Sequence, residues 1–195
     1  VGELAAGLGL GALPVLGTAI VQAGRIEPEA VAASVPAFFM TFDLLLLNEF
    51  PDEDADREGG RKNLVLLLGR RGAALVYAAA AVLTPVSIAA AVAAGALPPL
   101  CLVGTLPSLL LFAPLRWAFS DPGGPVPIPA LGANVAWNLL TNLAIGATQV
   151  IYGDTYNRNA LATTTYRWND LNGNKDYDDG ELGAYVSATG SSASV

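Results

Sequence analysis

A dense group of acidic side chains follows directly after a long apolar segment, between Asn48 and Asn63, where the sequence reads NEFPDEDADREGGRKN. Carboxylates concentrated beside apolar segments require a counter-ion, and Mg²⁺ is held in proteins by one or two carboxylates together with substrate phosphate oxygens. Asn48, Asp52 and Asp56 recur at helical spacing, so they would share one face if the preceding helix continued. The segment therefore predicts a site for Mg²⁺ and a phosphorylated ligand, and a solvated loop of mixed charge is the alternative.

Three other groups of polar residues could take part in chemistry. Asp43 lies within the apolar segment FMTFDLLLLN, where a carboxylate costs at least ~2.5–3.5 kcal/mol on insertion scales. It either lines a substrate cavity and orients an aromatic acceptor, or it lies nearer the interface or is protonated and hydrogen-bonded to a neighbouring helix. Asn134, Asn138 and Asn142 form one polar stripe, which predicts contacts between helices or, alternatively, the lining of a polar pocket.

The third group lies near the carboxy terminus and has the spacing of oxygen ligands in a calcium loop. Its residues are Asp170, Asn172, Asn174, Asp176, Asp178 and Glu181. The sixth position is Lys175 where an EF-hand requires glycine, so we expect either a looser Ca²⁺ site or a solvated turn.

The composition predicts a membrane protein. Hydrophobic residues make up 53% of the chain and charged residues only 14%, and Gly72–Leu115 contains no charge. The chain contains no histidine and a single cysteine, which removes the usual general base and any internal disulfide. The net charge of −7 argues against a nucleic-acid partner.

The elements that position these residues are apolar helices. A membrane-spanning helix needs about 20 apolar residues, so the pattern predicts an all-α polytopic bundle of about five spans. We place them at Leu4–Ala23, Glu29–Asn48, Gly72–Gly95, Leu97–Phe119 and Leu131–Tyr152. Leu64–Leu68 predicts a short half-helix at the interface, with Arg70 and Arg71 at headgroup level.

The loops and the tail predict an orientation. The loop after the second span carries more lysine and arginine than any other, which predicts an inner or plasma membrane protein with the acidic loop in the cytoplasm. Residues 1–152 would form the membrane domain, and the polar, acidic residues 153–195 would form a short extramembrane tail outside, which could be a fused or chimeric segment. Because the chain begins with Val1 and its one methionine is Met40, we expect it to be a fragment.

The segment from Asn48 to Leu64, closing in Leu68-Gly69, resembles the second aspartate-rich motif of the UbiA-type membrane prenyltransferases. It is most similar to the branch that prenylates 1,4-dihydroxy-2-naphthoate in menaquinone synthesis. Gly7–Gly24 and Leu131–Thr141 are also similar to that branch, so the resemblance covers residues 1–152. It implies an alkyl or aryl transferase with nine helical spans, of which this chain would hold the last five.

The resemblance implies roles for individual residues. Asp52 and Asp56 would bridge Mg²⁺ to a polyprenyl diphosphate, Lys62 together with Arg61 would contact the diphosphate, and Asn48 would belong to the same motif. The family's first aspartate motif is absent from this chain, and Asn63 stands where the family usually has threonine. We therefore expect this chain to be inactive by itself. A non-catalytic membrane anchor that displays an acidic, calcium-binding appendage is the alternative.

Overall fold

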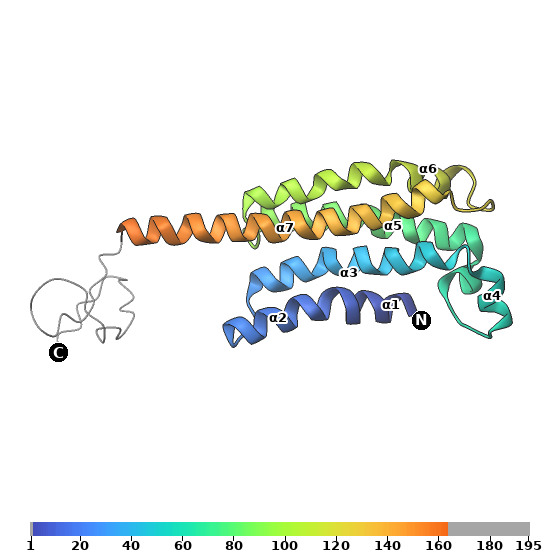
Figure 1. The fold of residues 1–195 in the computed structure, drawn as a ribbon, viewed down its shortest axis with the longest axis horizontal. Helices are drawn as coiled ribbons and strands as arrows, with labels where there is room; N and C mark the ends of the chain where they lie inside the picture. Colours follow the sequence, from blue (N-terminus) through green and yellow to red (C-terminus); the bar gives the residue numbers. More distant parts are fainter. Residues whose placement is uncertain (1, 164–195) are drawn as a thin grey trace, which may run out of the picture. The chain divides into compact units, whose positions relative to one another are not determined.

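The structure is a computed structural model that describes residues 2–163, with side chains for residues 2–149 apart from Ala23. Every regular element in this part of the chain is a helix, which confirms the predicted all-α fold (Figure 1). Contacts divide the chain into two units, residues 1–149 and 150–195. The helices below belong to the first unit, except that the last one continues into the second.

The first span is one continuous helical segment with a change of geometry in its middle. It consists of α1 (Gly2–Ala6), the π-helical turn η1 (Gly7–Ala12) and α2 (Leu13–Ala23). The π turn lies just before the start of α2, where Pro14 is the second residue and has no N–H for the helical ladder, and a wider turn accommodates such a defect. The helix ends at Gly24, which adopts the left-handed conformation.

The second span, α3 (Pro28–Glu49), lies alongside α1 and α2 (Figure 1). Pro28 occupies the first turn, where a missing N–H costs nothing. The helix ends at Glu49 because Pro51 cannot donate to the backbone ladder. A short helix, α4 (Glu53–Glu58), follows, with its acidic residues in the first turn, where they interact favourably with the helix dipole.

The third long helix, α5 (Leu64–Ala93), is interrupted at Gly69. The φ and ψ angles of Gly69 are 69° and 163°, a combination that only glycine adopts readily. This break separates Leu64–Leu68 from the long apolar part and confirms the predicted half-helix as a distinct segment. Its position relative to a membrane interface stays a prediction.

The last two helical segments complete the bundle. The 3₁₀ segment η2 (Pro99–Leu111) continues into α6 (Phe112–Ser120), and α7 (Ile128–Thr163) follows. Among the described residues four helices are long and apolar enough to cross a membrane, and α7 is not one of them. Its asparagine stripe lowers the hydropathy, so the expected count of about five is approximate. Because α7 runs to Thr163, the helix extends beyond the predicted end of the fifth span at Tyr152.

The core lies between α3, α5, α6 and the start of α7. Its largest cluster includes Phe42 and Leu46 of α3 and Phe50, which follows that helix, together with Tyr77 and Trp117. A second cluster joins Met40, Ala81, Leu111 and Trp137. Large aromatic side chains therefore pack the bundle at the end where the acidic loop begins.

The contact between the first span and α3 depends on two glycines. A Cβ atom added at Gly7 would lie 2.8 Å from the ring of Phe38, and one added at Gly11 would lie 2.5 Å from the carbonyl oxygen of Ala37. Small residues at this spacing allow helix backbones to approach closely in membranes. Gly9 lies between them, and a Cβ there would meet nothing within 4 Å.

We expect Gly11→Ala to destabilise the bundle, because the added methyl group forces α3 away from the first span. The loss should be about 1–3 kcal/mol. Thermal unfolding in detergent provides the measurement, and Gly9→Ala, the same change on the same turn, is the matched control. Equal unfolding temperatures for the two variants would contradict this account of the helix contact.

Candidate functional site

The acidic residues of the predicted motif do not lie on one continuous helix. Because α3 ends before Pro51, Asp52 lies in a turn and precedes the first residue of α4. The backbone N–H of Asp56 donates to the carbonyl oxygen of Asp52 at 2.8 Å, so these two residues remain one helical turn apart. The helix does not continue past Glu49, because Pro51 follows, so the condition under which Asn48 would share their face is not met.

Asp56 is buried and held in place by two neighbours. Its Oδ1 atom accepts a hydrogen bond from Arg61 Nη1 at 3.0 Å, and its Oδ2 atom accepts one from Asn63 Nδ2 at 2.8 Å. The hydrogen bond to Asp56 raises the pKa of Arg61 above its usual value. Asp52 by contrast is exposed. The two carboxylates thus differ: Asp56 has a defined orientation, and Asp52 faces solvent.

Asn63 links this site to the start of α5. Its Oδ1 atom accepts from the backbone N–H of Leu66 at 2.9 Å, which caps the helix, while its amide group donates to Asp56. The side-chain amide makes both bonds at once, because its oxygen accepts from Leu66 while its nitrogen donates to Asp56. Asn63, which stands where the family usually has threonine, therefore has a structural role.

The remaining predicted contacts lie at the surface of the same end of the bundle. Lys62 is exposed, and Arg61 bonds to the carboxylate of Asp56. Asn48 is also exposed, but its amide donates to the carbonyl oxygen of Leu44 in its own helix at 2.8 Å. The structure therefore brings Asp52, Asp56 and Arg61 together and leaves Asn48 bonded to α3.

Two further carboxylates, Glu3 and Glu49, lie at this site, and the sequence analysis did not select either one. Glu3 of α1 is fully buried, and its Oε1 atom accepts a hydrogen bond from the backbone N–H of Leu64. The carboxyl group of Glu49 lies against that of Glu3 and close to Asp56 and Arg61. An acid at the very start of an otherwise apolar span was the signal that could have identified Glu3.

Asp43 lies deeper in the bundle, roughly 9 Å along the helix axis from Glu49. It is fully buried within the bundle, and its depth relative to a membrane interface stays a prediction. Neither carboxyl oxygen has a hydrogen-bond partner among the described residues. Its backbone oxygen accepts from Asn134 Nδ2 at 3.2 Å, and Asn134 Oδ1 accepts from the Tyr77 hydroxyl group at 3.1 Å.

The asparagine stripe of α7 joins helices at one of its three positions. Asn134 is buried and bridges α3 and α5, as expected for a polar contact between helices. Asn142 is exposed and donates to Asn138 within the same helix, to the backbone oxygen at 2.9 Å and to the side-chain oxygen at 3.1 Å. The bridging interpretation therefore holds for Asn134.

Arg70 connects the acidic loop to the loop between α6 and α7. Its guanidinium group donates to the carbonyl oxygens of Pro122 (3.0 Å), Phe50 (3.1 Å) and Gly124 (2.7 Å), and to Glu53 Oε2 at 3.0 Å. Arg70 is only partly exposed and bonds to protein, and its expected position at headgroup level stays a prediction. It bonds to protein because both loops present acceptors at the point where α5 resumes after Gly69.

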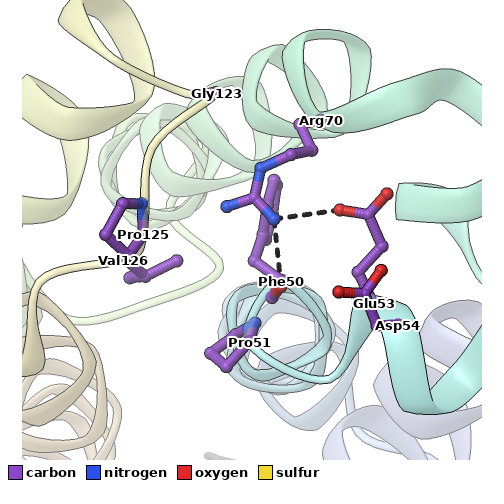
Figure 2. Close-up of a pocket in the computed structure, with 8 residues that line it drawn as sticks. All are labelled: Phe50, Pro51, Glu53, Asp54, Arg70, Gly123, Pro125 and Val126. Carbon is purple, nitrogen blue, oxygen red and sulfur yellow. Dashed lines mark hydrogen bonds and ion pairs between the residues drawn. The ribbon is translucent and has the colours of Figure 1, made fainter.

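The Arg70 network borders a pocket of about 310 Å³ (Figure 2). Its walls are Phe50, Pro51, Glu53, Asp54, Arg70, Gly123, Pro125 and Val126. The guanidinium group lies over the ring of Phe50, 5.3 Å from its centroid. The hydrogen bond from Arg70 also lowers the pKa of Glu53, so this carboxyl group stays ionised below its usual range.

The donors at this site fit Mg²⁺ in one particular way. Asp52 and Asp56 offer hard carboxylate oxygens, but no group of three or more metal-ligating side chains occurs in the described part of the chain. Mg²⁺ commonly keeps several waters and binds through one or two carboxylates plus phosphate oxygens. The residues therefore fit a metal that arrives with a phosphorylated ligand, and they do not form an all-protein cage. The six candidate calcium ligands, Asp170 to Glu181, lie outside the described residues.

Comparison with known proteins identifies the family to which the chain is similar. A family model described as the UbiA prenyltransferase family matches residues 1–152. Among curated proteins, 1,4-dihydroxy-2-naphthoate octaprenyltransferase from Bacillus subtilis is 31% identical over 98 residues. That match covers 50% of this chain and 32% of the relative, so the chain spans about a third of the relative's length. No solved structure matches.

We expect Arg70→Gln to destabilise the protein by more than about 2 kcal/mol, because hydrogen bonds to a charged group are worth roughly 1.5–3 kcal/mol each. The three carbonyl oxygens and Glu53 would lose their shared donor. Thermal unfolding in detergent measures the effect, and Arg71→Gln is the matched control because Arg71 is exposed. If both variants unfold like the unmutated protein, Arg70 does not hold the loops together.

Proposed function

The chain belongs to the UbiA prenyltransferase family, and we propose that the whole protein transfers a polyprenyl group from its diphosphate to an aromatic acceptor. The observation that carries this proposal is the pair Asp52 and Asp56, one turn apart beside Arg61 and Lys62, at the end of an apolar helix. The relative's name supports a dihydroxynaphthoate-like acceptor, and hence a place in menaquinone synthesis.

The residues of the acidic loop would have different tasks. Arg61 and Asn63 orient the carboxylate of Asp56, so it is already ordered before a ligand binds. Asp52 is exposed and can turn toward an incoming ligand. Mg²⁺, held by Asp52 and Asp56, would neutralise charge on the diphosphate leaving group.

Arg61 and Lys62 would bind the diphosphate itself. Both extend from the loop that ends α4, and Lys62 is exposed and able to reach a phosphate oxygen. Arg61 bonds to Asp56 at 3.0 Å, and 70% of its side chain is exposed. It can therefore contact both the carboxylate and a phosphate. The loop therefore combines acidic groups for a metal with cations for the diphosphate oxygens.

Asp43 is proposed to contact the aromatic acceptor from within the bundle. Its buried carboxyl oxygens have no partner among the described residues, and a hydroxyl group of an acceptor could donate to them. Asn48 is proposed only as a peripheral contact, since its amide is bonded within α3. We expect residues 1–195 by themselves to transfer no prenyl group, because the family's first aspartate motif is not among them.

The protein is an integral membrane protein, and we propose that the acidic loop faces the cytoplasm. Support comes from the four apolar helices of the described part and from the concentration of cations in the loop after α3. The tail would then lie outside, on the opposite side of the membrane.

Removing either aspartate should abolish turnover. In the whole protein, Asp52→Ala or Asp56→Ala is expected to lower kcat by about a hundredfold or more, since each removes charge stabilisation in the transition state. Prenyl transfer from radiolabelled polyprenyl diphosphate measures the effect, and Asp54→Ala is the control, because Asp54 is an exposed acid between the two. Normal turnover by both aspartate variants would contradict the proposal and favour the membrane-anchor interpretation.

The orientation can be tested with cysteines. Gly59→Cys should be protected from an impermeant thiol reagent in intact cells, whereas Ser187→Cys in the tail should be labelled. The native Cys101 is buried and gives little background. The reverse pattern would place the acidic loop outside and remove the cytoplasmic site.

A further inference from the structure

Glu3 is an ionisable residue that the proposed reaction does not explain. It lies in the first turn of α1, is fully buried, and comes from a helix that contains no other charge. Burying a carboxyl group at the end of a membrane helix is costly unless the group has a specific partner. Its partner is the backbone N–H of Leu64, which lies 61 residues away in the sequence.

The Leu64 N–H group is one of the donors that a helix leaves unpaired at its start. Two different segments satisfy these donors in α5: Glu3 of α1 accepts from Leu64, and the side chain of Asn63 accepts from Leu66 at 2.9 Å. Asn63 in turn donates to Asp56 at 2.8 Å. A continuous path therefore runs from Glu3 through Leu64 and Asn63 to the carboxylate of Asp56.

The loop that carries Asp56 is fastened at both of its ends. At its beginning, Glu53 is bonded to Arg70 at 3.0 Å, and at its end Leu64 is bonded to Glu3. Between these points the loop includes Gly60, whose φ angle is 68°. The second attachment is the hydrogen bond that fixes the start of α5 to α1.

Simple packing does not account for Glu3. Its carboxyl group lies against that of Glu49, and the Oε2 atoms of both residues have no hydrogen-bond partner among the described residues. An apolar residue would pack this contact at lower cost, because buried ionisable groups are often less stabilising than well-packed hydrophobic replacements. The oxygen that accepts from Leu64 is what an apolar residue could not provide.

We propose that Glu3 is a positioning residue, which orders the start of α5 through the Leu64 N–H and thereby holds Asp56 in the geometry that binds metal and diphosphate. This inference rests on the proposed function for its catalytic part. The first helix of the chain thereby supports the acidic loop, although no residue of this helix belongs to the aspartate motif.

The test compares Glu3→Gln with Glu3→Ala in the whole protein. Glutamine keeps the acceptor oxygen and loses the charge, whereas alanine removes the acceptor. Glu29→Ala is the matched control, because Glu29 is an exposed acid in the first turn of α3. Two readouts are needed: the Mg²⁺ concentration that gives half-maximal prenyl transfer, and hydrogen–deuterium exchange of the backbone amides of residues 56–66.

We expect Glu3→Ala to raise the half-maximal Mg²⁺ concentration about tenfold, the lower end of the effect of outer-shell partners on metal affinity. Saturating Mg²⁺ should restore most of kcat, and exchange of residues 56–66 should become faster. Glu3→Gln should behave like the unmutated protein in both readouts. A residue with only a structural role would instead lower thermal stability and kcat without changing the Mg²⁺ requirement.

The inference is overturned if Glu3→Ala leaves both the Mg²⁺ requirement and the exchange unchanged, or if Glu3→Gln is as impaired as Glu3→Ala. If the unmutated protein transfers no prenyl group, the proposed function fails on its own account. The exchange measurement then still decides whether Glu3 orders the loop that carries Asp56.

Discussion

This end of the bundle depends on the hydrogen bonds that the guanidinium group of Arg70 donates. Arg70 lies directly after the break at Gly69, where α5 turns, and its donors reach carbonyl oxygens of the α3–α4 turn and of the α6–α7 loop as well as Glu53. Buried carbonyl oxygens without a donor are costly, and one planar cation satisfies several of them at once. The edge-on contact of Trp117 with Phe50 closes the same junction, with ring centroids 4.8 Å apart.

This arrangement explains how polar groups can gather at the end of an apolar bundle without opening it. Three buried or partly buried acids at this end have a defined neighbour: Glu53 has Arg70, Asp56 has Arg61 and Asn63, and Glu3 has the start of α5. Exposed carboxylates remain at Asp52 and Asp54. The bonded acids keep the site stable while it is empty. The exposed acids remain able to bind a charged ligand.

Asp43 differs from these acids because its buried carboxyl group has no hydrogen-bond partner among the described residues. It is buried beside the contact that links α3, α5 and α7 through Asn134 and Tyr77. Among the described residues its carboxyl group has no donor, whereas the polar groups around it do have partners. The two sets of acids are therefore distinct in depth and in environment, and a ligand with a charged head and an aromatic or apolar body would meet them separately.

The local pattern was sufficient to predict the helices, the break before Arg70 and the acidic motif. Each follows from neighbouring residues: apolar runs of membrane length, a glycine that can adopt positive φ, and acids at a helix end. The same reasoning left open whether the helix continues, and it does not, because Pro51 separates Asn48 from Asp52 and Asp56. Only the tertiary structure could decide that Asp56 is buried while Asp52 is exposed, that Arg70 joins the acidic loop to the α6–α7 loop, and that Glu3 reaches Leu64. These features depend on contacts between segments far apart in the chain, and periodicity along one segment contains no information about which distant donor will face it.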